Sequence, residues 1–215
     1  MIGLLGGTFD PIHFGHLRVA LEVKELFSLT EVRLIPSATP PHRLQPAASA
    51  QMRSEMLALA VKNHPALRVD TRELGRSGAS YTVDTLASLR KDFPDESLLL
   101  FIGADAFLHL THWYRWQHLF DYAHVVVMTR PGFMIEVVDC FFSERLVHAR
   151  EALVQTRAGK LFFQAVTPLD ISATAIRRMI AEKQNPGFLL PDAVIEYIQQ
   201  NQLYQARSSS STHDV

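Results

Sequence analysis

The sequence contains almost no cysteine and no excess of charge of either sign. The one cysteine among its 215 residues, Cys140, cannot form an intramolecular disulfide and excludes a metal site built from several cysteines, as fits a reducing cytoplasm. Basic and acidic residues number 21 and 22, which gives a formal net charge of -1. So balanced a chain has no bulk positive field to attract nucleic acid or an anionic membrane. Any phosphate binding must therefore be local.

Long apolar runs are also absent. No apolar stretch reaches the roughly 18 residues that span a bilayer, and the first apolar run lacks a basic flank and is broken by Gly6 and Gly7, unlike a secretory signal. We therefore expect a cytoplasmic protein with no membrane partner. The length suits one domain, expected over residues 1–206, and the serine-rich residues 207–215 are expected to be a disordered tail. Monomer and homodimer both remain open.

Two familiar phosphate-binding motifs are missing. A P-loop needs Gly-Lys followed by Ser or Thr, whereas the Gly-Lys pair at residues 159–160 continues into leucine. Gly3, Gly6 and Gly7 have the wrong spacing for a dinucleotide fingerprint, and the second expected strand ends at Pro36 without an acidic residue for a ribose. A phosphate site would therefore need a different motif.

Apolar runs of strand length alternate with segments of helical periodicity. The expected strands are 1–5, 32–35, 67–70, 98–102, 125–128 and 161–163, and the expected helices are 16–27, 52–61, 82–89, a segment through Leu146 and Leu153, 173–181 and 191–198. This alternation predicts an α/β fold with a parallel sheet, whose ligands bind at the carboxyl ends of the strands.

The segment from Gly6 to His16, GGTFDPIHFGH, follows the first expected strand and leads into the first expected helix. Glycines let the backbone approach a ligand, and a helix start favours an anion, so phosphate is the natural ligand. His13 and His16 are close enough in sequence for both rings to reach one anionic group, to which an imidazole can donate. A single histidine here would more often be a loop or capping residue, whereas this pair favours a site.

This segment resembles the signature of the nucleotidyltransferase superfamily, His-x-Gly-His. A second signature of that superfamily, Ile-Ser-Ser/Ala-Thr-x-Ile-Arg, is matched by residues 171–177. Between the two, the segments that resemble bacterial nicotinate mononucleotide adenylyltransferases are Pro40–Arg43, Ser80–Thr82, Gly103–Asp105, Trp113-Tyr114 and Arg130–Gly132. The similarity covers nearly the whole chain. It implies one nucleotidyltransferase domain with a Rossmann-like open, mainly parallel sheet, helices on both faces and a small C-terminal helical part.

The resemblance also implies the reaction and the partners. The AMP moiety of ATP would pass to nicotinate mononucleotide, with pyrophosphate released and with nicotinamide mononucleotide as a second acceptor still open. Nothing in the sequence suggests a covalent intermediate, so direct attack is expected. Mg²⁺ would be carried by the phosphates of ATP rather than by a metal site of the protein.

The expected site residues fall into three groups. The catalytic residues are His13, His16 and Arg177. The ATP-binding residues are Gly6, Gly7, Thr8, Phe9, Gly103, Asp105 (to a ribose hydroxyl), Ile171, Ser172, Thr174 and Arg177, the last with Ser172 holding pyrophosphate. The acceptor-binding residues are His42, Arg43, Tyr81, Thr82, Trp113 (stacked on the pyridine ring), Tyr114 and Arg130.

Plainer roles remain open for several of these residues. His42 and Arg43 could be a solvated basic pair, and Thr82, Asp105 and Ser172 could be helix caps. Another adenylyl or cytidylyl transferase, such as the phosphopantetheine type, is the alternative enzyme. A module that binds ATP without turning it over is the alternative outside enzymes. Residues 133–160 suggest no chemistry.

Overall fold

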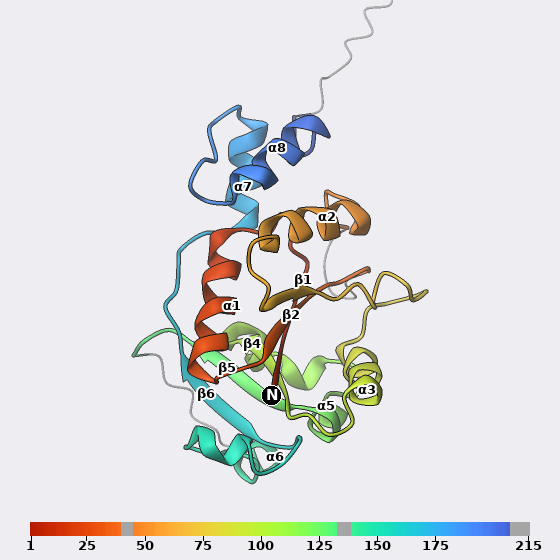
Figure 1. Ribbon diagram of the computed structural model, residues 1–215, viewed down its shortest axis with the longest axis vertical. Coiled ribbons are helices and arrows are strands. Elements are labelled where there is room, and N and C mark those ends of the chain that lie inside the picture. The colour runs from red at the N-terminus through yellow and green to blue at the C-terminus, as the bar shows by residue number, and fades with distance from the viewer. Residues whose placement is uncertain (40–44, 133–138, 207–215) are drawn as a thin grey trace, which may run out of the picture.

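A parallel sheet forms the centre of the molecule. The computed structural model describes residues 1–39, 45–132 and 139–206 (Figure 1). In these residues the strands are β1 (Ile2–Gly7), β2 (Glu31–Pro36), β3 (Leu67–Val69), β4 (Leu98–Gly103), β5 (His124–Thr129) and β6 (Leu161–Ala165). They lie in the order β3-β2-β1-β4-β5-β6, and every neighbouring pair is parallel. The expected parallel α/β sheet is confirmed.

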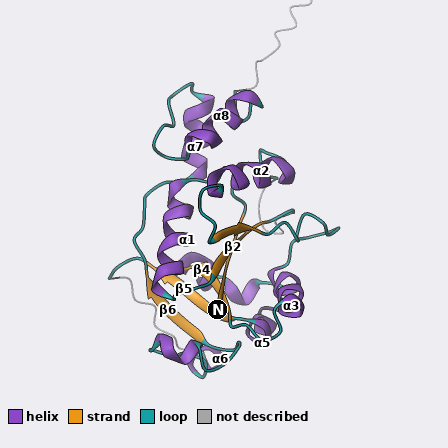
Figure 2. Ribbon diagram, viewed as in Figure 1, coloured by secondary structure: helices purple, strands orange, loops and turns teal. Residues whose placement is uncertain are grey.

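Helices follow the strands and cover both faces of the sheet (Figure 2). The α-helices are α1 (Phe14–Leu26), α2 (Ala50–Val61), α3 (Thr82–Asp92), α4 (Ala104–Leu108), α5 (Leu119–Tyr122), α6 (Cys140–Ser143), α7 (Ala173–Ala181) and α8 (Asp192–Gln200). The 3-10 helices are η1 (Leu110–His112), η2 (Trp116–His118) and η3 (Arg150–Leu153). No helix of the described residues is long and apolar enough to cross a membrane.

Two separate apolar cores explain why the strands read as nearly continuous hydrophobic runs. Successive side chains of a strand point to opposite faces, so Leu99 and Phe101 of β4 join the core beneath α1, α2 and α8. Leu98, Leu100 and Ile102 join the core beneath α3 and α5. Because both faces are buried, each strand needs apolar residues at almost every position.

The strand order reverses between β1 and β4. The chain passes outward from β1 through β2 to β3, then returns to place β4 on the other side of β1. Ligands of open α/β sheets bind at such a switch point, outside the carboxyl ends of the strands. Here those ends are Gly7 and Gly103. The segments that follow them are residues 8–13, which we call the phosphate loop after the ligand predicted for it, and the start of α4.

The C-terminal helices lie over this same edge. Figure 1 shows α7 and α8 beyond the end of α1, next to α2. The Phe14 amide, at the first residue of α1, donates to the Leu189 carbonyl at 2.9 Å. Tyr197 on α8 donates its hydroxyl to Glu55 on α2. The expected small helical part at the C-terminus is therefore present, and it contacts the elements that border the switch point.

One expectation about the helices is wrong. No continuous helix joins Leu146 to Leu153, because Leu146 forms a parallel bridge with Leu161 and only residues 150–153 form a short 3-10 helix. The apolar Leu146 therefore pairs with the edge strand β6 and does not lie on a helix. The first helix begins at Phe14, two residues before the expected start at His16. The predicted disordered tail, 207–215, lies outside the described residues.

Candidate active site

The phosphate loop and the glycines on either side of it, Gly7 and Gly15, make tight contacts with aromatic rings. A Cβ atom on Gly7 would lie 2.9 Å from the Phe9 ring, and one on Gly15 would lie 2.9 Å from Nδ1 of His13. Real Cβ atoms do not approach other atoms so closely. Phe9 itself has a φ of 50°, in the left-handed region that non-glycine residues rarely adopt. The glycines are therefore required because aromatic side chains fold back over the backbone.

The two histidines of the loop lie together at the start of α1. Their rings stack with centroids 3.7 Å apart, and the Phe9 ring meets His16 edge-on at 5.1 Å. His13 is only 5% exposed, and burial lowers its pKa to about 4, so its ring is neutral at physiological pH. Its Nδ1 is buried and has no hydrogen-bond partner among the residues that the structure describes. A buried polar atom that makes no hydrogen bond to the protein can bind a ligand at the start of the helix.

The second signature segment, residues 171–177, contacts the phosphate loop through Arg177 of α7. Nη1 of Arg177 donates to the Asp10 carbonyl at 2.6 Å, a contact across 167 positions of sequence, and lies 3.8 Å from Oδ2 of Asp10. Nη2 of the same arginine donates to the Thr174 hydroxyl at 3.4 Å. The structure thus brings together the two signature segments.

Three other expected ATP-binding positions border the same place. The Ile171 carbonyl is 3.6 Å from where a Gly15 Cβ would be. Ser172 caps α7, and its Oγ accepts from the Ala175 amide at 3.1 Å. The capping role that the sequence left open is therefore real, and it leaves the Ser172 hydroxyl proton available to donate elsewhere. Gly6 lies on β1 itself, next to the loop.

Two of the residues predicted to bind the acceptor, Tyr81 and Tyr114, lie in contact. The Tyr81 and Tyr114 rings are 4.5 Å apart, which joins the Ser-Tyr-Thr turn to the Trp-Tyr turn. Trp113 is half-buried and packs against the core on the α3 face. Thr82 is the first residue of α3, whose N-cap is Tyr81, so the alternative that Thr82 caps this helix is wrong. His42 and Arg43 lie outside the described residues.

The remaining predicted positions lie at the carboxyl ends of β4 and β5. Gly103 is the last residue of β4, and Asp105 lies exposed in the first turn of α4. Arg130 directly follows β5 and is exposed. Gly103 is in register with Met128. Asp105 and Arg130 therefore both lie at the carboxyl end of the sheet, as does the phosphate loop.

Arg53 is a component that sequence reasoning overlooked. It is 1% exposed and lies on α2. Its guanidinium donates to the carbonyls of Thr8 (2.6 Å), Ser37 (2.7 Å), Ala38 (3.3 Å) and Ala48 (3.2 Å). It therefore fastens the phosphate loop to the segments that flank residues 40–44. A single arginine in a helical pattern resembles a solvated residue, so the sequence carries no signal of this role.

Asp10 and Ser80 are two further positions without a predicted role. The Asp10 carboxylate, 5% exposed, accepts from the amides of Ala47 (2.8 Å) and Ala48 (3.2 Å). The Ser80 hydroxyl accepts from the amides of Ala38 and Thr39 at 3.0 and 3.2 Å. Asp10 thus ties residues 47–48 to the phosphate loop, and Ser80 ties residues 38–39 to the turn before α3. The sequence could have indicated these roles, because Asp10 lies in the segment from Gly6 to His16 and Ser80 lies in the Ser-Tyr-Thr segment.

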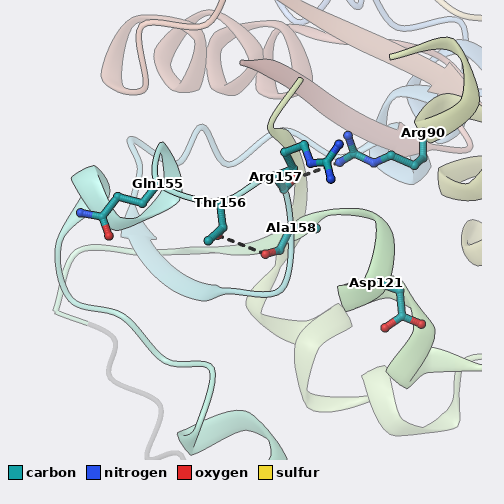
Figure 3. A pocket seen from close by; sticks show the side chains of 6 residues that line it. All are labelled: Arg90, Asp121, Gln155, Thr156, Arg157 and Ala158. Carbon is teal, nitrogen blue, oxygen red and sulfur yellow. Dashed lines mark hydrogen bonds between the residues drawn. The ribbon is translucent and has the colours of Figure 1, made fainter. Parts of the chain in front are cut away.

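A different hollow, of about 490 Å³, lies at the opposite edge of the sheet (Figure 3). It is lined by Arg90, Asp121 and residues 155–158. Arg90 donates to the carbonyls of Phe93, Pro94, Glu96, Tyr122 and Arg157, and the Arg157 carbonyl also accepts from the first amide of β4. Arg90 is held by these backbone carbonyls, and the hollow borders the amino ends of the strands, so it is not the candidate active site.

Comparison with known proteins agrees with this geometry. The cytidylyltransferase-like family model matches residues 4–179. A protein of Halorhodospira halophila named "Probable nicotinate-nucleotide adenylyltransferase" is 51% identical over 196 residues, 90% of each chain. A protein of the same name from Methylococcus capsulatus is 48% identical over 208 residues, 95% of this chain and 99% of its own.

Solved structures show the same fold at low sequence identity. Nicotinic acid mononucleotide adenylyltransferase of Plasmodium falciparum, complexed with NaAD, superposes with a TM-score of 0.70 at 18% identity, covering 94% of this chain and 96% of its own. The same protein complexed with APC gives a TM-score of 0.68 at 17% identity, with the same coverage. With two signature segments joined at the switch point, and relatives near 50% identity along almost its full length, the chain belongs to the cytidylyltransferase-like family and, within it, to the nicotinate-nucleotide adenylyltransferases.

Proposed function

We propose that this enzyme transfers the adenylyl group of ATP to nicotinate mononucleotide, which gives nicotinate adenine dinucleotide and pyrophosphate for NAD biosynthesis. The observation that carries the proposal is the meeting of the two signature segments. Arg177 of α7 contacts the phosphate loop at Asp10, beside the stacked pair of His13 and His16. Donors from both ends of the chain thus border one place at the sheet edge, as a triphosphate requires. The names of the relatives supply the acceptor.

The reaction is a direct displacement at the α-phosphorus. A phosphate oxygen of the mononucleotide forms a bond to the α-phosphorus while the bond from that phosphorus to the bridging oxygen of the β-phosphate breaks. The protein aligns the two phosphates and stabilises the charge of the transition state. In the proposal, His13 and His16 donate to the oxygens of the α-phosphate, while Arg177 and Ser172 hold the departing pyrophosphate.

The state of His13 supports a hydrogen-bonding role rather than a charged one. Burial keeps its ring neutral, and a neutral imidazole offers one N–H donor at no electrostatic cost. A phosphate close to the ring raises its pKa, because an opposite charge favours the protonated form. A bound phosphate therefore favours protonation of the His13 ring, in addition to the permanent charge of Arg177.

Aromatic residues define the acceptor side. A pyridine ring is flat and electron-poor, and it suits an offset stack on the Trp113 indole. Tyr81, Thr82 and Tyr114 border the same place, and the contact between the two tyrosine rings supports their grouping. We propose that nicotinate mononucleotide is the preferred acceptor and nicotinamide mononucleotide a poorer one. His42, Arg43 and Arg130 complete the acceptor set in the proposal.

On the ATP side, Asp105 receives a ribose hydroxyl in the proposal, while residues Gly6 to Phe9 and the turn from Ile171 to Thr174 contact the phosphates. Mg²⁺ prefers oxygen ligands and is readily carried by nucleotide phosphates. In the described part of the chain, no cluster of three or more His, Cys, Asp or Glu is arranged to hold a metal ion alone. We propose that Mg²⁺ binds with ATP and neutralises phosphate charge there. The exposed free thiol of Cys140 fits the proposed cytoplasmic location.

Direct displacement can be tested by stereochemistry. ATP with a chiral sulfur-substituted α-phosphorus should give a dinucleotide with inverted configuration at that phosphorus. Retention would show two successive displacements and a covalent intermediate, which would contradict the proposal.

The role of His16 can be tested by substitution. His16→Ala should lower kcat by about 100-fold or more, the usual effect of losing one donor to a transition-state oxyanion. The matched control is His64→Ala, since His64 is exposed and lies in the connection leading to the amino end of β3. An unchanged kcat in His16→Ala would remove this residue from the mechanism. Binding of ATP by the wild type without turnover would instead indicate a regulatory module.

A further inference from the structure

Tyr204, which lies beyond α8, reaches the phosphate loop. Its hydroxyl donates to Oδ1 of Asp10 at 2.7 Å, across 194 positions of sequence. The Tyr204 backbone has a φ of 61°, in the left-handed region that is uncommon for a non-glycine residue. Burial and the neighbouring Asp10 carboxylate raise the Tyr204 pKa far above its ordinary value. The hydroxyl therefore stays protonated at every working pH and is a constant donor.

The carboxylate that Tyr204 contacts stands beside the arginine of the second signature segment. Oδ1 of Asp10 receives the Tyr204 hydroxyl and the Ala48 amide, and Oδ2 receives the Ala47 amide. Nη1 of Arg177 is 3.8 Å from Oδ2, within ion-pair range but beyond a hydrogen bond. Arg177 instead donates to the Asp10 main-chain carbonyl. The side-chain charges are thus close together but not joined by a direct hydrogen bond.

A triphosphate and the Asp10 carboxylate would compete for the same guanidinium. A bidentate pair between Arg177 and Asp10 would be strong, and ATP would have to break it before binding. Each donor that satisfies Asp10 from another direction weakens that pull. Tyr204 is the only side-chain hydroxyl among the donors that the described residues direct at this carboxylate.

We propose that Tyr204 is a positioning residue for ATP binding. By engaging Oδ1 of Asp10, its hydroxyl holds the carboxylate in the orientation that keeps Arg177 available to the triphosphate. The inference rests on the proposed role of Arg177 and extends it to a residue outside both signature segments. The C-terminal segment thereby sets the ATP affinity of a loop near the N-terminus.

The test is Tyr204→Phe, which removes the hydroxyl and keeps the ring. We expect the dissociation constant of ATP, measured by calorimetry without acceptor, to rise about tenfold, which corresponds to about 1.4 kcal/mol. The KM for nicotinate mononucleotide and the kcat at saturating ATP should change less than twofold. A merely structural role would not separate the two substrates in this way.

The matched control is Tyr197→Phe. Tyr197 also donates its hydroxyl to a carboxylate, that of Glu55, from the same helical part of the chain, but away from Asp10. It should leave the ATP dissociation constant unchanged. Unchanged ATP affinity in Tyr204→Phe, or an equal loss in both variants, would overturn the proposal. Because ATP binding is measured without turnover, failure of the proposed reaction in the wild type would be a separate result.

A double-mutant cycle tests the route through the carboxylate. Asp10→Asn removes the charge that competes for Arg177, so adding Tyr204→Phe to it should change ATP affinity less than twofold. A full tenfold effect in the Asp10→Asn background would show that Tyr204 acts by another route and would overturn the inference.

Discussion

Replacing Arg53 by methionine should destabilise the fold more than any other single change at the site. The buried guanidinium donates to four carbonyls, and the bonds to Thr8 (2.6 Å) and Ser37 (2.7 Å) are the shortest. A hydrogen bond from a charged donor contributes about 1.5 to 3 kcal/mol, so these two bonds together give about 3 to 6 kcal/mol. Methionine would also remove a positive charge near the buried Asp10 carboxylate, which would keep Arg177 as an ion-pair partner.

This loss is a large share of the roughly 5 to 15 kcal/mol by which proteins are usually stable. We expect urea unfolding, followed by circular dichroism, to give a free energy of unfolding lower by about 3 kcal/mol or more, and Tm to fall by roughly 10 °C. Arg53→Lys should recover part of the loss, because an ammonium keeps the charge but cannot span the same carbonyls.

The control is Arg18→Met, since Arg18 is half-exposed and its pairing with Glu22 contributes little. It should change the free energy of unfolding by less than about 0.5 kcal/mol. An Arg53→Met variant that loses less than about 1 kcal/mol would refute the view that this residue fastens the loop.

Three further predictions follow from the same geometry. Burial lowers the pKa of His13 to about 4 and also lowers that of His124, so the folded state resists protonation of both rings. The free energy of unfolding should therefore be highest above about pH 6.5 and decline as pH falls toward 4, by roughly 3 kcal/mol for His13. A flat profile of unfolding free energy over this range would contradict the prediction. Gly15→Ala should displace the His13 ring and lower kcat at least tenfold, and wild-type kcat would show that the close approach is not needed. Trp113→Ala should raise the KM for nicotinate mononucleotide about tenfold, as expected for a lost stacking partner. The control is Trp116→Ala, because the Trp116 ring packs on Phe141 and Phe142, and this variant should mainly lower Tm. Equal KM values in the two variants would argue against stacking at Trp113.

Local patterns were enough to predict the sheet and the longer helices, α1, α2, α3, α7 and α8. A strand buried on both faces reads as an unbroken apolar run, and β4 from Leu98 to Gly103 is the clearest case. Ser172 was recognisable as a helix start because its short hydroxyl side chain can cap the next amides. Leu146 misled because one apolar residue at a sheet edge has the same appearance as one on a helix face.

Some residues of the candidate site could be recognised in the sequence, and others could not. The signature segments were visible because each is a continuous run of residues, from Gly6 to His16 and from Ile171 to Arg177. The groups that hold these segments in place come from elsewhere in the chain. Arg53 and Tyr204 act on them through contacts across 45 and 194 positions, which no local pattern encodes.

The most direct test of the proposed reaction is pyrophosphate release from ATP and Mg²⁺ with one acceptor at a time: nicotinate mononucleotide, nicotinamide mononucleotide or phosphopantetheine. The account predicts rapid release with the first, slower release with the second and none with the third. Release only with phosphopantetheine, or no release with any acceptor despite ATP binding, would contradict it.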